Sequence, residues 1–484
     1  MSKTMKTIVS TGIVIISQFL VSEISFGANS PDNTRPKPAK SITITIDPAT
    51  AFQEIEGFGA SLTDSSAWLL YKFLNADQRK AVLTDLFDPA NGIGLSYLRQ
   101  PMGASDFRLK EYSYDDLPAG VTADYDLKHF SIAYDEDYVI PTLREIRAIN
   151  PDVRIMASPW SPPTWMKTTG LIGSGHLKDD VYTTYANYFV KFIQAYAAHE
   201  IPINVVTPQN EPYYEPKSYA GCRMEPAEQA RLVKEMGHAF AKHNISAKIL
   251  IWDHNWDKPE YAITVLSDPN VRPYIAGTAF HHYAGKVSAQ STVHDAYPDK
   301  ALYFTEGSDG TWNDRGFEAD LVRNGVFMVD TLRHWAKTII KWNLVLDEKN
   351  GPKIPGGCDT CYGVVTINQS TRKVSPRPHY YALGHISKFL RPGAVRIDSN
   401  DSDIRTVAFK NTDGSIVLYT VNPGKQPAFM RLDWNKQRLN YKIPPRCIMT
   451  FRWDDKPNAK VDIYLTTGDQ SSLLKQQPSA SFRN

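Results

Sequence analysis

Short apolar segments alternate with longer segments of helical periodicity between residues 55 and 346. In the longer segments apolar residues recur every three or four positions, as at Tyr185, Phe189 and Phe192, and such residues share one face of a helix. Strands that alternate with helices form a parallel sheet, and eight of them close a (β/α)8 barrel of the TIM type. The eight predicted strands cover residues 54–61, 93–100, 153–158, 204–209, 248–253, 276–281, 301–306 and 339–346.

The pattern changes after Pro378. Short segments with a two-residue period follow one another, and turns such as Asp413-Gly414 separate them, which is typical of an antiparallel β-sandwich. The predicted fold class is therefore α/β: a (β/α)8 TIM barrel with an accessory antiparallel β-sandwich domain. The predicted sandwich strands cover residues 395–397, 405–410, 416–421, 429–433, 442–443, 448–453 and 460–465.

The N-terminus has the pattern of a secretory signal peptide. Lys3 and Lys6 precede an apolar stretch over residues 8–21, and small residues follow at 25–28. The alternative is a membrane anchor, but the stretch is shorter than the roughly 20 apolar residues that a span needs. We therefore expect a secreted or periplasmic protein without a transmembrane anchor. A polar, Pro-rich linker begins at Asn29.

Composition narrows the range of partners. The formal net charge is only +2, which argues against a nucleic-acid partner, because such a protein carries a clustered basic excess. Apolar residues make up 42% of the chain and can fill a large core. Aromatic residues make up 11%, and a surplus of Trp and Tyr also supplies flat platforms for sugar rings.

Two of the four cysteines, Cys358 and Cys361, lie three residues apart in a Gly- and Pro-rich loop. A zinc site would need a second pair or nearby histidines at ligand spacing, and none is present in the sequence. A thioredoxin-type motif would open a helix. A short disulfide that staples the loop suits an exported chain better. We predict no metal site.

Two glutamates end predicted barrel strands. Glu211 follows the fourth strand in Asn210-Glu211-Pro212, and Glu306 ends the seventh. Catalytic groups of such barrels gather at the carboxyl ends of the strands. Two carboxylates there can cleave a glycosidic bond, at about 5–5.5 Å apart with retention and about 6.5–9.5 Å apart with inversion. The alternative is that each forms an ordinary ion pair, but a matched pair among Trp and His favours catalysis.

Other polar and aromatic residues lie at neighbouring strand ends. An arginine near the nucleophile would keep that carboxylate ionised, and a tyrosine would orient it by a hydrogen bond. Taken singly, each residue has an ordinary structural alternative: a core Trp, a satisfied His or an ion pair. The candidates are Arg99, Asp106, Trp160, His281, Tyr283 and Trp342.

At these residues the chain resembles glycoside hydrolase family 30, the group that contains glucosylceramidase and microbial β-1,6-glucanases. The resemblance covers nearly everything from residue 45 to 453. It rests on the ordered motifs at residues 53–64, 158–164, 207–212, 304–307, 342–344 and 381–389.

The resemblance implies a double-displacement mechanism without a cofactor. Glu306 corresponds to the nucleophile of the family and Glu211 to its general acid/base, for which we expect a raised pKa. Arg99 and His281 would support this pair. The corresponding sugar-binding residues are Asp106, Trp160, Asn210, Tyr283 and Trp342.

The resemblance also implies a sandwich built from both ends of the chain. The expected division is a signal peptide (1–28), a linker (29–44), a sandwich strand (45–54), the barrel (55–378), the remaining sandwich (379–470) and a polar tail (471–484). Residues 460–475 resemble a segment that microbial relatives carry near the N-terminus. We therefore hypothesise a permuted ending that supplies a sandwich strand.

The leading hypothesis is a secreted retaining β-glucosidase of the glucosylceramidase type, whose partner is a β-glucoside substrate, either a glycolipid or a glucan. The nearest rival is an endo-β-1,6-glucanase. His282 stands where glucosylceramidase has Trp, and the Cys358–Cys361 loop is more similar to microbial members. The alternative from a different functional class is a non-catalytic carbohydrate-binding protein. The presence of both glutamates disfavours it.

Overall fold

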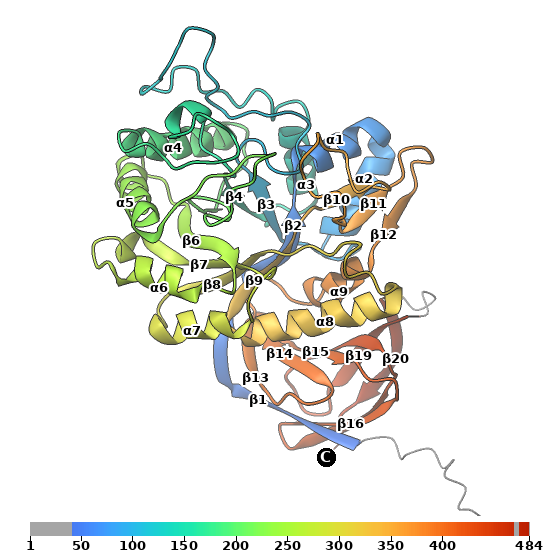
Figure 1. Cartoon of the computed structure of the whole chain (residues 1–484). Helices are drawn as coiled ribbons and strands as arrows, with labels where there is room; N and C mark the ends of the chain where they lie inside the picture. The colour runs from blue at the N-terminus through green and yellow to red at the C-terminus, as the bar shows by residue number, and fades with distance from the viewer. Residues whose placement is uncertain (1–40, 469–473, 484) are drawn as a thin grey trace, which may run out of the picture. The chain divides into compact units, whose positions relative to one another are not determined.

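The computed structural model describes residues 41–468 and 474–483. Within them, eight parallel strands follow one another around a closed barrel, in which β9 pairs with β2 (Figure 1). The expected (β/α)8 barrel is confirmed. Its strands are β2 (Gly57–Ser61), β3 (Tyr97–Pro101), β4 (Arg154–Ser158), β5 (Val205–Val206), β6 (Lys248–Asn255), β7 (Ile275–His281), β8 (Ala301–Glu306) and β9 (Ala336–Lys341).

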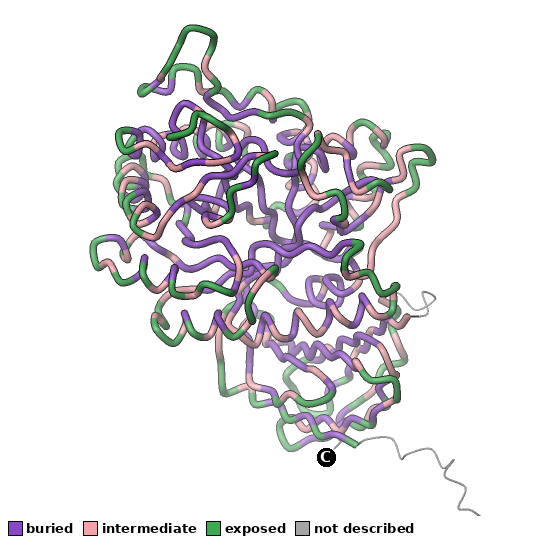
Figure 2. The backbone as a smooth tube through the Cα atoms, viewed as in Figure 1, coloured by how far each residue is buried: buried purple, intermediate pink, exposed green. Residues whose placement is uncertain are grey.

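Helices surround the barrel and bury one face each. In α4 (Tyr182–Ala198) the aromatic residues Tyr185, Phe189 and Phe192 are fully buried, as their helical spacing predicts. Figure 2 shows the barrel strands buried in the middle of the described chain. The other helices around the barrel are α1 (Asp64–Phe73), α2 (Ala76–Phe87), α3 (Val139–Ile149), α5 (Pro226–Lys242), α6 (Pro259–Ser267), α7 (Ser288–Ala296) and α8 (Phe317–Arg333).

The eighth barrel strand differs from its prediction. We expected it at residues 339–346, but β9 ends at Lys341 and Asn343 takes a left-handed conformation with a φ of 61°. This break places Trp342 just beyond the strand, at the mouth of the barrel. The chain then forms a separate three-stranded sheet of β10 (Val345–Asp347), β11 (Val365–Ile367) and β12 (Val374–Pro376).

The second domain is one nine-stranded sheet in the order β17-β16-β1-β13-β14-β15-β18-β19-β20. Neighbouring strands are antiparallel except that β1 runs parallel to β16. The strand expected at residues 45–54 begins earlier, because Ile42, Ile44 and Ile46 alternate with exposed polar residues and all three are buried. The strands are β1 (Ser41–Glu54), β13 (Val395–Ser399), β14 (Arg405–Lys410), β15 (Ile416–Asn422), β16 (Ala428–Trp434), β17 (Gln437–Ile443), β18 (Cys447–Trp453), β19 (Lys460–Thr467) and β20 (Lys475–Ser481).

Part of the expected polar tail is a strand. β20 pairs with β19, and Arg438 and Arg483 then exchange two backbone hydrogen bonds that join the two ends of the sheet. Because β20 is an edge strand whose side chains are mostly exposed, backbone pairing holds it and no apolar pattern marks it. β19 itself pairs with β18, as the permutation hypothesis requires of this segment.

Helix α8 packs between the barrel and the sheet, against β14, β15 and β18 (Figure 1). Gly325 permits this close approach, since a Cβ atom there would lie 2.8 Å from Ile448 and 2.9 Å from Val421. α9 (Pro378–Ser387), which we had assigned to the sandwich from residue 379 on, also contacts α8 and β2 of the barrel. One continuous core therefore joins the two domains.

The predicted signal peptide and most of the predicted linker lie outside the described residues. Among the described residues, no helix combines the length and the apolar character needed to cross a membrane.

The end of the chain offers a test of how the two ends of the sheet are joined. Phe482 is 2% exposed and packs on Trp434 and Trp453, with ring centroids 5.1 and 5.3 Å away. We expect Phe482→Ala to lower the free energy of unfolding by about 3 kcal/mol in chemical denaturation, because the site cannot refill the lost volume. Phe429→Ala, at a ring that is 48% exposed on β16, serves as the control and should change it by less than about 0.5 kcal/mol. Equal effects of the two variants would contradict the observed packing.

Candidate active site

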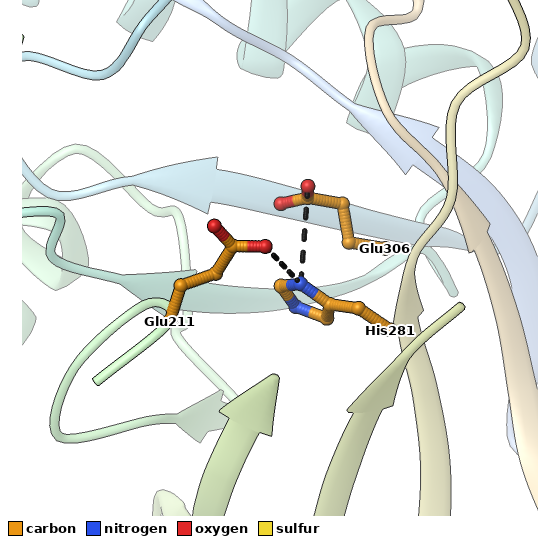
Figure 3. A group of neighbouring side chains, drawn as sticks. All are labelled: Glu211, His281 and Glu306. Carbon is orange, nitrogen blue, oxygen red and sulfur yellow. Dashed lines mark hydrogen bonds and ion pairs between the residues drawn. The ribbon is translucent and has the colours of Figure 1, made fainter. Parts of the chain in front are cut away.

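Glu211 and Glu306 meet at the carboxyl ends of the barrel strands. Glu306 is the last residue of β8, and Glu211 follows β5 in a left-handed turn with a φ of 47°. The backbone N–H of Glu211 donates to the carbonyl of Asp253, 3.0 Å away, and this bond fixes the turn to the end of β6. One carboxylate oxygen of each glutamate lies within 4.8 Å of the other (Figure 3). This separation suits retention rather than inversion.

Arg99 holds Glu306 in place from β3. The guanidinium is fully buried and donates to Oε2 of Glu306 at 2.5 Å and to Oδ1 of Asn210 at 2.6 Å. The hydroxyl of Tyr283 donates to the other oxygen, Oε1, at 2.9 Å. Both oxygens of Glu306 thus receive a hydrogen bond, which orients the carboxylate and stabilises its charge.

Asp253, near the end of β6, is a residue that sequence reasoning missed. It is fully buried and accepts five side-chain hydrogen bonds. Burial alone raises the pKa of Asp253, but the Arg99 charge and these hydrogen bonds outweigh it and hold the pKa well below its ordinary value. The strand-end rule that selected Glu306 would also have selected Asp253, which closes the predicted strand 248–253. Its donors are Arg99 (2.9 Å), Ser158 (2.7 Å), Thr207 (2.7 Å), His281 (3.0 Å) and Thr305 (2.7 Å).

His281 links Asp253 to Glu211. Its Nε2 lies 3.0 Å from Asp253 Oδ1. Its Nδ1 lies 3.1 Å from Glu211 Oε1 (Figure 3). Burial lowers the pKa of His281, but the charge of Glu306 and the two hydrogen bonds raise it to about 9. We therefore assign His281 as an imidazolium that donates from both nitrogens.

The pKa values of the two glutamates correct our expectation. Burial raises the pKa of Glu211, but the hydrogen bond from His281 and nearby positive charges outweigh it, so the pKa lies below its ordinary value. Burial also raises the pKa of Glu306, and there it outweighs the charges of His281 and Arg99. The expected raised pKa of Glu211 is wrong for the free site, because Glu211 faces a protonated histidine rather than an apolar wall.

Asp106, Trp160 and Trp342 form the wall beside Glu306. The two indoles stack with centroids 5.0 Å apart, and Arg99 lies over Trp160 at 4.8 Å. Trp160 is 4% exposed and Trp342 is 3% exposed. The two indoles therefore pack on Arg99 and on each other and do not form an open platform. Oδ1 of Asp106 is buried without a partner among the described residues, and burial with the charge of Glu306 raises the pKa of Asp106 to about 7. Asp106 is thus suited to a hydrogen bond with a substrate hydroxyl.

Cys358 and Cys361 form a disulfide in a loop beside this wall. A side chain at Gly357 would collide with the carbonyl oxygen of Asp106, and Thr311 N–H donates to the carbonyl of Thr360 at 2.9 Å. The disulfide loop therefore braces the segment that carries Asp106 and the segment after Glu306.

The trio of Glu211, His281 and Glu306 has the atom types of a metal site. Both nitrogens of His281 already donate to carboxylates, however, and its pKa of about 9 keeps it protonated. A protonated imidazole has no lone pair for a metal ion. The arrangement therefore fits acid–base chemistry better than metal binding.

Comparison with known proteins agrees with this geometry. A family model described as the glycosyl hydrolase family 30 TIM-barrel domain matches residues 55–390, and the family 30 beta sandwich domain matches residues 393–451. The chain is 32% identical over 399 residues to an endo-1,6-beta-D-glucanase of Neurospora crassa. The aligned residues cover 79% of this chain and 81% of that protein. It is 30% identical over 464 residues to the lysosomal acid glucosylceramidase of Mus musculus, covering 89% and 86%. Among solved structures, an endo-beta1,6-glucanase superposes with a TM-score of 0.80 at 36% identity, covering 88% of this chain and 97% of that one.

Asp253 can be tested by Asp253→Asn, which keeps the shape but removes the charge between Arg99 and His281. We expect kcat/KM on an aryl β-glucoside to fall about 100-fold, because both supports of the glutamate pair lose their orientation. The pKa of His281 should also fall, so the alkaline limb of the pH–rate profile moves to lower pH. Ser158→Ala, which removes one of the five donors, is the control and should cost far less. An unchanged alkaline limb would contradict the assignment of His281.

The protonated His281 also predicts a pH dependence of stability. Its pKa in the fold, about 9, exceeds the ordinary value of about 6.5. Its contribution to stability is therefore fully present below about pH 6.5 and is lost as the pH rises through about 9. Between about pH 6 and pH 10 the melting temperature of the wild type should fall by about 3 °C more than that of His281→Gln, measured by calorimetry. Parallel curves for the two proteins would show that His281 is not charged in the fold.

Proposed function

The chain belongs to glycoside hydrolase family 30, and we propose that it hydrolyses β-D-glucosidic bonds with retention of the anomeric configuration. The observation that carries this proposal is the pair of carboxylates of Glu211 and Glu306 within 4.8 Å of each other. Such a pair divides the reaction into formation and hydrolysis of a glucosyl-enzyme ester.

In the first step a carboxylate oxygen of Glu306 attacks the anomeric carbon, and the bond from that carbon to the leaving oxygen breaks. Arg99 and Tyr283 orient the attacking carboxylate through their hydrogen bonds at 2.5 and 2.9 Å. Glu211 gives a proton to the leaving oxygen. In the second step Glu211 takes a proton from water, and the resulting hydroxide breaks the ester with a second inversion, so the product is the β-anomer.

His281 supplies the proton that Glu211 must donate. In the free site this proton lies on His281, 3.1 Å from Glu211. The negative charge of Glu306 is the largest of the effects that raise the pKa of His281, and this charge disappears as Glu306 becomes an ester. The pKa of His281 then falls. The proton moves to Glu211 while the bond to the leaving oxygen breaks, and Glu211 passes it to that oxygen.

For the leaving group we propose a β-1,6-linked glucan. Support comes from the 36% identity to a solved endo-beta1,6-glucanase and from the Cys358–Cys361 loop, which resembles the loop of microbial members. Glucosylceramide is the second candidate, supported by the 30% identity over most of the chain to the mouse glucosylceramidase. Hydrolysis of pustulan compared with glucosylceramide separates the two. We also propose that the chain is exported, on the N-terminal pattern of residues 1–28.

The catalytic pair can be tested by labelling and by substitution. A 2-deoxy-2-fluoro-β-glucoside should label Glu306, as measured by mass spectrometry of the modified peptide. Glu306→Gln should lower kcat about 10³-fold or more. Glu211→Ala should also be slow but regain turnover with azide, which attacks the glucosyl-enzyme without a general base and gives β-glucosyl azide. Glu260→Gln, at an exposed glutamate of α6, is the control. A label on another residue, or an α-azide product, would refute the assigned roles.

A further inference from the structure

Large apolar side chains that are exposed gather at the mouth of the barrel. Six of the seven in the described part of the chain lie in loops that follow barrel strands: Val121, Tyr125, Leu171, Tyr214, Tyr283 and Trp312. The exception, Phe429, lies on the sandwich. These loops leave the carboxyl ends of the barrel strands, which is the end that holds Glu211 and Glu306.

Tyr214 is the member of this group nearest in the chain to Glu211. Its backbone N–H donates to the carbonyl of Glu211 at 2.8 Å, and its side chain is 48% exposed. In the proposed mechanism Glu211 contacts the leaving oxygen, so the leaving group lies beyond Glu211 and away from Glu306. Tyr214, three residues after Glu211 and bonded to its carbonyl, therefore belongs to the loop that the leaving group would meet first.

Tyr219 connects Tyr214 to the catalytic pair. The two rings lie 6.2 Å apart at an angle of 41°, and Tyr219 packs on the cluster that contains Trp160 and Trp342. Burial, and then the charges of Asp106 and Glu211, raise the pKa of Tyr219. The two phenols thus form a surface that runs from the buried carboxylates to solvent.

The adjacent Tyr213 shows a different environment. Its ring packs edge-on against Trp252 and Tyr261, Arg223 lies over it at 4.2 Å, and its hydroxyl donates to Glu225. Tyr213 is partly buried with its ring and hydroxyl engaged by these neighbours, whereas Tyr214 is 48% exposed. The exposure of Tyr214 is therefore not a general property of this loop.

The loop that carries Tyr214 and Tyr219 is held firmly at its base. The buried ammonium of Lys167 donates to the carbonyls of Gly221 at 2.5 Å and Ile172 at 2.8 Å. The hydroxyl of Ser218 donates to the carbonyl of Gly356, at 3.1 Å, in the disulfide loop. A ligand that contacts these rings would have little loop entropy to overcome.

We propose that Tyr214 and Tyr219 bind the first sugar unit on the leaving-group side, and that they select a carbohydrate leaving group over a lipid. This proposal rests on the proposed function. Phenol rings stack on the C–H faces of a sugar while their hydroxyls bond to its hydroxyls. The exposed residues between the two tyrosines are Glu215, Lys217 and Ser218, which suit a hydroxylated ligand and not an aliphatic tail.

The experiment compares substrates that differ only in the leaving group. Gentiobiose places a glucose on the leaving-group side, β-glucosyl fluoride places nothing there, and glucosylceramide places a lipid. For Tyr214→Ala we expect the loss of kcat/KM to be about tenfold larger on gentiobiose than on the fluoride, and Tyr214→Trp should recover most of it. Phe429→Ala, at a ring of the same 48% exposure, is the control and should change neither value.

Other outcomes overturn the proposal. An equal loss on gentiobiose and the fluoride would mean that Tyr214 only shapes the catalytic pair. A selective loss on glucosylceramide would make a lipid the occupant of the surface. If the wild type hydrolyses the fluoride and Tyr214→Ala keeps full activity on gentiobiose, the proposed sugar site is refuted. The proposed function is then unaffected. A wild type inactive on all three substrates would refute the proposed function itself.

Discussion

The active site depends on one buried ion pair, between Arg99 of β3 and Asp253 of β6, with an N–O distance of 2.9 Å and no exposure of either side chain. Arg99 extends this pair to Glu306 and Asn210, and Asp253 extends it to His281 and so to Glu211. Two buried charges cost several kcal/mol each unless they are paired and hydrogen-bonded. Loss of either partner therefore disturbs both glutamates at once.

The barrel is what makes this pairing possible. Arg99, Asp253 and Glu306 are far apart in the chain, yet they lie at the same end of parallel strands whose register the backbone ladder sets. For this reason the strand-end rule, applied to the sequence, located both glutamates, Arg99 and His281 correctly at one mouth. The same rule also points to Asp253, at the end of the predicted strand 248–253, but the sequence does not show that this carboxylate is fully buried and paired with Arg99 and His281.

Three other features could not be predicted from the sequence, because each depends on a long-range contact or on a backbone conformation that the sequence pattern does not indicate. β20 is held by backbone pairing with β19, which is a long-range contact without an apolar signature, so its polar residues indicated a tail. Trp342 was expected inside a strand, because the turn at Asn343 depends on a left-handed residue that periodicity does not mark. The pKa of Glu211 depends on a hydrogen bond to His281, 70 residues away, and local surroundings do not indicate its direction.

The charges around the active site explain why His281 carries a proton in the free protein. Glu211, Glu306 and Asp253 bring three carboxylates together, and Arg99 brings one permanent positive charge. The positive charge of protonated His281 offsets a second negative charge, and its two ring N–H groups donate to two of the three carboxylates, Glu211 and Asp253. In the proposed mechanism Glu306 loses its negative charge when it forms the ester, and the proton on His281 is then held less strongly, because that charge helps to raise the pKa of His281. On the proposed mechanism, the attack of Glu306 on the sugar and the transfer of a proton through Glu211 to the leaving oxygen would therefore be linked through the charge balance around His281.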